Sequence, residues 1–488
     1  MEYRSTRSSL FVSPAQAIFT GLAPDGGLFV PVREDFPALP WEPLTKMSLP
    51  EIVAALAAAF FPDLADLSRT LTRRAYEGRF DDPEYTPTVS LGDGLYLTEL
   101  FHGPTAAFKD VALSLLPHLL AAAKDKLGIR EDVAVLTATS GDTGKAALEG
   151  FKNVPGTRIV VFYPAGGVSL IQRAQMVTQE GENVAVAGIR GNFDDAQTGV
   201  KEIFRRHAQD SSFRLSSANS INIGRLVPQM SYYFKTYGDL VARGKIQPGE
   251  KLDFAVPTGN FGNILAGYLA KCMGLPVGRL ICASNANDVL TEFIATGKYD
   301  RRRRLLKTDS PSMDILVSSN LERLLYFLSL EAAFTGRLMT DLANDGYYQL
   351  PADLHNRVKA LFYGARATDA EGAAALAKTC QKSGYVADPH TAVALCAVEK
   401  YRAETGSETP VAVLATASPY KFSKPVLAAL GQDTSGDEFE LIDRLNALTG
   451  VPVPRGLASL RGKAERHTSV IRRDEMESFA LGQFGGKA

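Results

Sequence analysis

The sequence predicts a large α/β protein built on parallel sheets, and three observations support that fold class. Short apolar runs alternate with longer helical segments along most of the 488 residues. The composition is that of a globular protein, with 45% hydrophobic and 22% charged residues, which excludes wholesale disorder. Loops rich in glycine and hydroxyl groups follow several of the apolar runs, as they do at the carboxyl ends of parallel strands.

Each of five apolar runs is followed by a segment with helical periodicity, and a sixth run comes later. The expected strand–helix pairs are 133–136 with 145–150, 158–163 with 170–178, 184–189 with 194–206, 253–256 with 264–273, and 279–283 with 290–295, and the last strand is 411–415. Before these pairs the chain mixes turns with a helical stretch at 49–60. Because ligands bind at the carboxyl ends of parallel strands, we expect the site in the loops after these strands.

Charge and hydropathy exclude several classes of function. The formal net charge is −1, whereas a nucleic-acid-binding protein usually carries a basic surplus. No apolar run approaches the roughly 18 residues of a membrane span. Residues 1–11 lack the apolar core of a signal peptide, so we expect a cytoplasmic protein.

The four cysteines are far apart in the sequence, with no CxxC pair and no histidine close by. They are Cys272, Cys282, Cys380 and Cys396. This spacing predicts buried thiols rather than a disulfide framework or a zinc site, and we expect no metal.

The first strand-end loop of interest, 137–145, reads Thr-Ala-Thr-Ser-Gly-Asp-Thr-Gly-Lys and opens a helix. Its glycines and N–H groups suit an anion at a helix N-terminus. It is not a P-loop, because Thr139 replaces the first glycine and Ala146 replaces the magnesium-binding hydroxyl. For such a loop alone, an ordinary capped helix start is the more common explanation.

Two further loops have similar chemistry. The loop 257–263, Pro-Thr-Gly-Asn-Phe-Gly-Asn, suits a phosphate at the start of the next helix, but it lacks the GxGxxG dinucleotide fingerprint. Residues 416–419, Thr-Ala-Ser-Pro, place hydroxyl groups after the last strand, and a plain turn explains them equally well.

A single lysine, Lys109, follows a Gly-Pro turn and enters an apolar helical segment. An amine in apolar surroundings has a lowered pKa, which suits a base or an amine that reacts with an aldehyde. A surface lysine in a first helical turn is the ordinary alternative. Together with two anion loops and a hydroxyl for a ring nitrogen, however, Lys109 indicates pyridoxal phosphate chemistry.

These residues resemble those of the threonine synthase family, in its longer bacterial and fungal branch. The resemblance extends over nearly the whole chain. Its segments are 3–7, 21–28, 101–110, 140–144, 219–229, 259–263, 287–291, 312–315, 318–323, 388–393 and 416–421. It implies two parallel-sheet α/β domains of the fold type II pyridoxal-phosphate enzymes, similar to the β subunit of tryptophan synthase.

The resemblance also implies the reaction, a carbon–oxygen lyase reaction on a phosphate ester. O-phospho-L-homoserine and water would give L-threonine and phosphate, by γ-elimination and β-hydration, as the last step of threonine biosynthesis. Two alternatives stay open: a related phospho-lyase that forms 2-oxobutyrate, and a homologue that binds a ligand without turning it over.

Site residues follow from the resemblance position by position. Lys109 would bind the cofactor covalently and act as the catalytic residue, with Thr416 on the pyridine nitrogen and Asp142 near the 3′-oxygen. The cofactor phosphate would be held by Gly259, Asn260, Phe261, Gly262 and Asn263. The substrate would be held by Ser140, Gly141, Asp142, Thr143, Lys145 and Arg225. Lys145 and Arg225 are the candidates for binding its phosphate, and the ordinary alternative is that each is a surface charge.

The resemblance places a smaller domain with the carboxylate loop at residues 96–245 and a larger cofactor-binding domain at 246–431. An N-terminal segment, 1–95, and a C-terminal helical extension, 432–488, would pack around them. We expect a small-molecule substrate, no nucleic-acid or membrane partner, and a monomer or homodimer.

Overall fold

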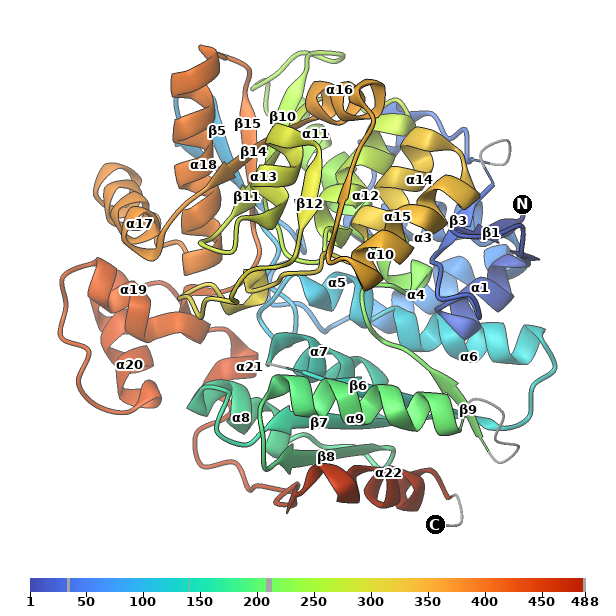
Figure 1. The fold of residues 1–488 in the computed structure, drawn as a ribbon. Coiled ribbons are helices and arrows are strands. Elements are labelled where there is room, and N and C mark those ends of the chain that lie inside the picture. Colours follow the sequence, from blue (N-terminus) through green and yellow to red (C-terminus); the bar gives the residue numbers. More distant parts are fainter. Residues whose placement is uncertain (33–35, 140, 208–212, 486–488) are drawn as a thin grey trace.

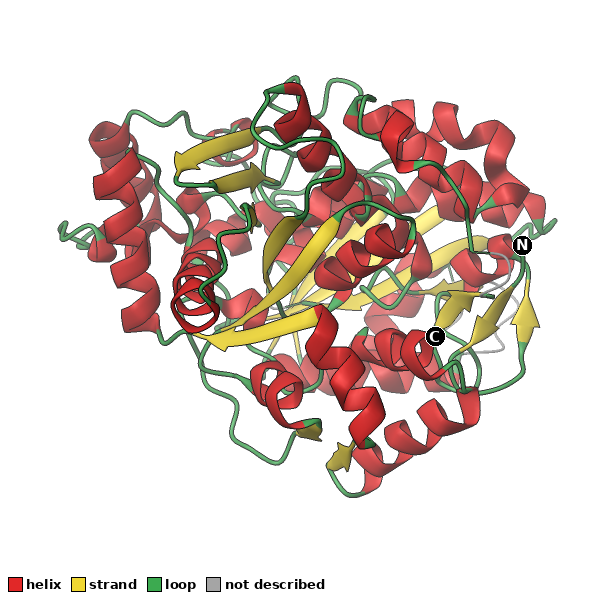
Figure 2. Ribbon diagram, turned by 90° about the horizontal axis from the view of Figure 1, so that it is seen from above, coloured by secondary structure: helices red, strands yellow, loops and turns green. Residues whose placement is uncertain are grey.

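Two parallel sheets organise the molecule, as the sequence predicts. The computed structural model describes residues 1–32, 36–139, 141–207 and 213–485. In Figure 1 the larger sheet lies in the upper part of the view and the smaller sheet in the lower part, with helix α5 between them. Seen from above, the strands run through the interior and the helices surround them (Figure 2).

The larger sheet has six strands in the order β14-β11-β10-β15-β5-β4. All neighbours are parallel except β4, which pairs antiparallel with β5 at one edge. The strand bounds are β4 Thr88–Gly92, β5 Leu95–Glu99, β10 Leu252–Pro257, β11 Val277–Ser284, β14 Phe362–Arg366 and β15 Val411–Ala415. The central strands β10 and β15 are buried along their whole length, which matches a sequence that is apolar except for Asp253.

The smaller sheet has five strands in the order β16-β8-β7-β6-β9, and every pair is parallel. The bounds are β6 Asp132–Ala138, β7 Thr157–Pro164, β8 Val184–Ile189, β9 Phe213–Ser216 and β16 Val470–Ile471. The edge strand β16 comes from the C-terminal part of the chain, which therefore packs on this sheet.

Alternate side chains of the smaller sheet enter two different cores. Val133 and Val135 point into the main core, whereas Ala134 and Leu136 pack with helices α9 (Phe193–Arg206) and α22 (Met476–Phe484) on the other face. Helix α9 is amphipathic, since its buried residues Ala196, Gly199, Val200 and Ile203 follow helical spacing. Both faces of the sheet are thus covered.

The other elements surround these two sheets. The remaining helices are α1 Pro14–Thr20, α2 Trp41–Leu44, α3 Leu49–Phe60, α4 Ser68–Tyr76, α5 Lys109–Leu113, α6 Leu116–Lys126, α7 Asp142–Phe151, α8 Leu170–Val177, α10 Ile223–Gln229, α11 Ser231–Ala242, α12 Gly262–Cys272, α13 Val289–Thr296, α14 Leu321–Ser329, α15 Ala332–Asn344, α16 Ala352–Leu361, α17 Asp369–Ser383, α18 Pro389–Thr405, α19 Ser423–Ala429, α20 Glu438–Thr449 and α21 Arg455–Ala458. Single-turn helices include η2 Pro62–Leu67, η3 Pro311–Met313, η4 Pro419–Phe422 and η5 Arg473–Glu475. The minor strands are β1 Tyr3–Ser5, β2 Phe11–Val12 and β3 Phe29–Pro31, which form a small antiparallel sheet, and β12 Lys298–Asp300 with β13 Tyr347–Gln349.

All six strands and all six helices expected from the sequence are confirmed, to within a few residues at their ends. Two strands refine the expected division of the chain. β5 belongs to the larger sheet, although most of it falls within the segment assigned to the smaller domain, and the expected helical extension contributes β16 to the smaller sheet. The reason is that β5 lies next to the edge of its sheet and β16 lies at the edge of the other. Local periodicity in the sequence does not reveal which sheet such a strand joins.

The cysteine prediction is partly wrong. Cys282 and Cys396 are buried, but Cys272 is exposed and Cys380 is partly exposed, because helical ends place them near the surface. Among the described residues, no three His, Cys, Asp or Glu side chains are grouped closely enough to hold a metal. No helix within the described ranges has the length and apolar character needed to cross a bilayer.

Candidate active site

Lys109 is fixed at the carboxyl end of the larger sheet. The backbone just before it pairs with the residues that follow β15: the Phe108 N–H donates to the Thr416 carbonyl at 2.8 Å, and the Ser418 N–H donates to the Ala106 carbonyl at 3.1 Å. Ala106 needs a positive φ of 56° to make this turn. These bonds place Lys109, the first residue of α5, beside the hydroxyl loop 416–418.

The Lys109 amine is buried next to both an acid and other cations. Its Nζ lies 3.8 Å from the Asp142 carboxylate and 3.5 Å from the Ser312 hydroxyl. Burial lowers the pKa of Lys109 to about 8; Asp142 opposes this shift, and the positive charge of Lys421 reinforces it. A lysine in this state has a substantial fraction of reactive free amine near neutral pH.

Asp142 lies in the first turn of α7, on the side of the smaller sheet, and is also buried. Its carboxylate forms an ion pair of 2.5 Å with Lys421. Burial alone would raise the pKa of Asp142, but attraction to Lys421 and then to Lys109 outweighs it and holds the pKa well below its usual range. Asp142 is therefore ionised between two ammonium groups.

The loop 140–144 presents only part of its backbone to a ligand. Ser140 lies outside the described residues. The Thr139 hydroxyl accepts hydrogen bonds from the N–H groups of Gly141 and Gly144, at 3.0 and 2.9 Å. Gly141 has φ 143°, and a Cβ there would lie 2.4 Å from the Gln172 side chain, so this position requires glycine. The N–H groups of Asp142 and Thr143, in the first turn of α7, have no intrahelical partner and suit a carboxylate.

The loop 257–263 links β10 to α12 and is held tightly from behind. The Ser318 hydroxyl donates to the Gly259 carbonyl at 2.7 Å, and the Asn320 N–H donates to the Asn260 carbonyl at 3.1 Å. Phe261 adopts a left-handed φ of 62° immediately before the helix. With the carbonyls bonded to the protein, the N–H groups at the start of α12, from Gly262 onward, suit an anion.

Asn263 carries an unsatisfied donor at this helix start. Its Oδ1 accepts from the hydroxyls of Tyr232 and Tyr233, at 2.6 and 3.2 Å, which fixes the side chain. Its buried Nδ2 has no hydrogen-bond partner among the described residues. A buried amide without a partner is costly, and a bound anion would satisfy it.

Arg225, on α10, is a buried cation with no carboxylate partner in the described chain. Its Nη1 donates to the Ala218 carbonyl at 3.0 Å, and its Nε has no partner. Burial lowers the pKa of Arg225 to about 10, and its charge in turn lowers the pKa of Lys109, so the two groups lie near each other. An unpaired buried guanidinium is a binding site for an anion.

Lys145 does not join this cluster, although the sequence predicts it as a candidate ligand of the substrate. Its ammonium donates to the Gln179 amide oxygen and lies 3.7 Å from the Glu149 carboxylate. Burial lowers the pKa of Lys145 to about 8, but its partners belong to α7 and to the segment after α8. Gln179 and Glu149 thus hold the Lys145 ammonium within the protein.

Three groups beside Lys109 have no assigned role in the sequence-based prediction: Lys421, Ser312 and the pair Asp388–His390. His390 Nδ1 bonds to the Asp388 carboxylate at 2.6 Å, and His390 Nε2 accepts from the Ser312 N–H at 3.2 Å. This pair thereby supports Ser312, the residue next to Lys109. Their segments are part of the family resemblance, but no local pattern indicates that they meet at the site.

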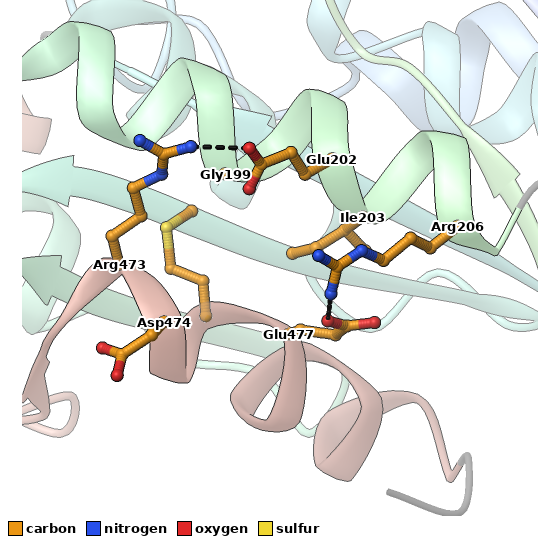
Figure 3. A pocket seen from close by; sticks show the side chains of 8 residues that line it. Gly199, Glu202, Ile203, Arg206, Arg473, Asp474 and Glu477 are labelled. Atoms are coloured by element: carbon orange, nitrogen blue, oxygen red, sulfur yellow. Dashed lines mark hydrogen bonds and ion pairs between the residues drawn. The ribbon is translucent and has the colours of Figure 1, made fainter.

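A cavity of about 400 Å³ lies elsewhere, between α9 and the C-terminal segment (Figure 3). Four of its charged side chains are paired with one another, Arg473 with Glu202 and Arg206 with Glu477. None of its lining residues contributes to the Lys109 cluster. The chemistry therefore points to the meeting of the two sheets and not to this cavity.

Comparison with known proteins agrees with this geometry. Family profiles match the chain as "Pyridoxal-phosphate dependent enzyme" over residues 84–417, "Threonine synthase N terminus" over 2–76 and "Threonine synthase, C-terminal" over 391–477. Threonine synthase of Saccharomyces cerevisiae is 38% identical over 462 residues, which cover 88% of this chain and 89% of the yeast protein.

Two other relatives define the extent of the similarity. Threonine synthase-like 1 of Homo sapiens is 40% identical over 464 residues, or 89% of this chain, and the chain spans 61% of that longer relative. The structure of pyridoxal-phosphate-bound threonine synthase from Brucella melitensis is similar with a TM-score of 0.87, 35% identity and 99% of both chains covered. The expected fold and family are confirmed, and the chain belongs to the threonine synthase family of pyridoxal-phosphate-dependent enzymes.

Proposed function

We propose that this chain converts O-phospho-L-homoserine and water to L-threonine and phosphate, the last step of threonine biosynthesis, with pyridoxal phosphate as its cofactor. The observation that carries the proposal is the buried amine of Lys109, with anion sites near it on two elements. One is the start of α12, and the other is the unpaired guanidinium of Arg225. A cofactor phosphate and a substrate phosphate need two such sites. Membership of the threonine synthase family supports the same reaction.

The residues present fit pyridoxal phosphate. Lys109 supplies the amine for its aldehyde, and the unsatisfied Nδ2 of Asn263, with the backbone of Gly259–Gly262, suits its phosphate. Thr416, next to the Lys109 segment, would bind the ring nitrogen, and Asp142 would face the 3′-oxygen side. When bound, pyridoxal phosphate supplies an acceptor for the electrons released at Cα of an amino acid.

Lys109 carries the proton transfers in this proposal. With the substrate bound, the free amine of Lys109 would remove the Cα proton and later return it. A pKa near 8 suits both directions, because the amine is neither fully protonated nor a weak base at physiological pH. Ser312, at 3.5 Å, limits the positions that the amine can take.

The anionic ends of the substrate fix its orientation. The N–H groups of Asp142 and Thr143 would hold the carboxylate, together with Gly141 and Ser140 as the sequence predicts. Arg225 would hold the phosphate, since it is buried and has no carboxylate partner in the described chain. We do not assign Lys145 to the substrate phosphate, because its ammonium donates to Gln179 and faces Glu149.

Water must add at Cβ after phosphate has left and before the product is released, since release without this hydration would give 2-oxobutyrate. The site lies between the two sheets, with Lys109 and Asp142 almost completely buried. We propose that the unit around the smaller sheet, which carries Asp142 and the carboxylate loop, closes over the substrate.

Location and assembly are further proposals. A cytoplasmic location is supported by the four cysteines, none of which forms a disulfide. We propose a monomer or homodimer, which light scattering coupled to gel filtration would measure.

Proton NMR of the cofactor-loaded protein with O-phosphohomoserine in buffered D2O tests the function. The expected result is threonine carrying deuterium at Cα and one phosphate per threonine. If the product is mainly 2-oxobutyrate, the chain is a phospho-lyase and not a threonine synthase. A coloured protein without turnover would contradict both.

A further inference from the structure

We propose that Lys421 is the permanent counter-ion of Asp142 and thereby a positioning residue that keeps the Lys109 amine free to react. This inference rests on the proposed function, because it concerns how Lys109 is prepared for the cofactor. Lys421 lies on the single turn η4, just after the hydroxyl loop 416–418.

The geometry of Lys421 is that of a fixed internal charge. Its side chain is 0% exposed, although lysine is among the residues least often buried. Its ammonium is 2.5 Å from Asp142 Oδ1 and donates to the Thr105 carbonyl at 3.1 Å. Lys421 follows a strand of the larger sheet and Asp142 follows a strand of the smaller one, so the ion pair joins the two units beside Lys109.

Asp142 needs a counter-ion that does not take part in the reaction. A buried carboxylate without a cation is strongly destabilised. Lys109 also faces Asp142, at 3.8 Å, but its charge changes when its amine reacts with an aldehyde. Lys421 does not react with the aldehyde, so it remains the partner of Asp142 at 2.5 Å whether Lys109 is charged or not.

The same arrangement sets the proton affinity of Lys109. Several charged groups act on each member of the cluster. Those that face Lys109 are Asp142, Lys421, Arg225 and Asp110, and those that face Asp142 are Lys421, Lys109 and His390. Without Lys421, Asp142 would pair with Lys109 alone, and no ammonium would repel the proton on Lys109. The amine would then hold its proton more tightly.

Uptake of pyridoxal phosphate by the cofactor-free full chain tests this role. The rate is followed as growth of visible absorption across a pH series, and its midpoint reports the protonation of the Lys109 amine. In Lys421→Met we expect the midpoint to rise by about one pH unit, so that uptake below the midpoint slows roughly tenfold. Lys421→Arg, which keeps the charge, should leave the midpoint close to the wild-type value.

Two controls separate charge from packing. Lys124→Met removes a buried lysine of α6 whose Nζ lies 4.0 Å from the carboxylate of Asp132, the first residue of β6. Lys124 lies outside the Lys109 cluster, so this substitution should not move the midpoint. The double variant Lys421→Met/Asp142→Asn removes both charges and should bring the midpoint back toward wild type. It should also fold even if Lys421→Met alone does not, since no bare carboxylate is left.

An unchanged midpoint in Lys421→Met would overturn the inference and leave the proposed function intact. If Lys421→Met does not fold, the double variant decides: its failure to fold would also overturn the inference. A wild-type chain that takes up no cofactor at any pH would instead overturn the proposed function, and this inference with it.

Discussion

Lys109 and Lys145 are two buried lysines whose surroundings differ. Burial lowers the pKa of each to about 8. Lys145 donates to Gln179 and faces Glu149 at 3.7 Å, so its ammonium is bound within the protein. Within the described part of the chain, Lys109 has a single long hydrogen bond from its amine, 3.5 Å to Ser312, and the neighbouring Asp142 is already paired with Lys421.

The difference shows that burial and a lowered pKa do not by themselves define a reactive lysine. What distinguishes Lys109 is that the neighbours of its amine leave it available. Asp142 is neutralised by Lys421, and Arg225, which has no carboxylate partner in the described ranges, provides a second positive charge for an incoming anion. Lys145 has the same pKa shift without any of these features.

The largest effect is expected for Lys109→Ala. Loss of the covalent cofactor site and of the base should reduce turnover by about 10³-fold or more. Threonine formation from O-phosphohomoserine measures it, with circular dichroism as a control for folding. Activity near the wild-type level would place the chemistry on another residue.

An intermediate effect is expected for Arg225→Met. Removal of charge-assisted hydrogen bonds to the substrate phosphate should cost roughly 2–3 kcal/mol, or about 30- to 150-fold in kcat/KM, mostly through a higher KM. Arg225→Lys is the matched control and should recover part of the loss. Unchanged kinetics in Arg225→Met would show that the substrate phosphate is bound elsewhere.

The smallest effect is expected for Lys145→Met. This substitution should leave kcat/KM within about threefold of wild type, because the ammonium serves Gln179 and the partly exposed Glu149 rather than the substrate. The melting temperature should fall by only a few degrees, because Glu149 is partly exposed and keeps its contacts with Arg79 at 3.3 Å and with the Gln179 amide N–H at 2.9 Å. A loss as large as that of Arg225→Met would show that Lys145 reaches the site and would remove the distinction between the two lysines.

The sequence predicts the fold and the loops of the site well, because both follow from short stretches of neighbouring residues. The strands and their loops follow from apolar runs and glycine positions: the loop 257–263 and Thr416 lie at strand ends, and Lys109 begins a helix, as expected. The hydroxyl loop and the Lys109 segment do meet, through the hydrogen bond from Phe108 to Thr416.

The side-chain partners are not predictable in the same way. Lys421 and Asp142 follow strands of different sheets and are far apart in the sequence, so no spacing rule connects them. His390 reaches Ser312 from the start of α18, which is again a tertiary contact. For Lys145 the sequence gives only a basic residue after a loop, and the direction of its side chain depends on Gln179.

The most direct test of the difference between the two lysines is borohydride reduction of the pyridoxal-phosphate-loaded protein, followed by peptide mass spectrometry. The structure predicts a stable cofactor adduct on the peptide that contains Lys109 and none on the peptide that contains Lys145. An adduct on Lys145, or on another lysine with Lys109 unmodified, would contradict the assignment of Lys109 as the reactive amine.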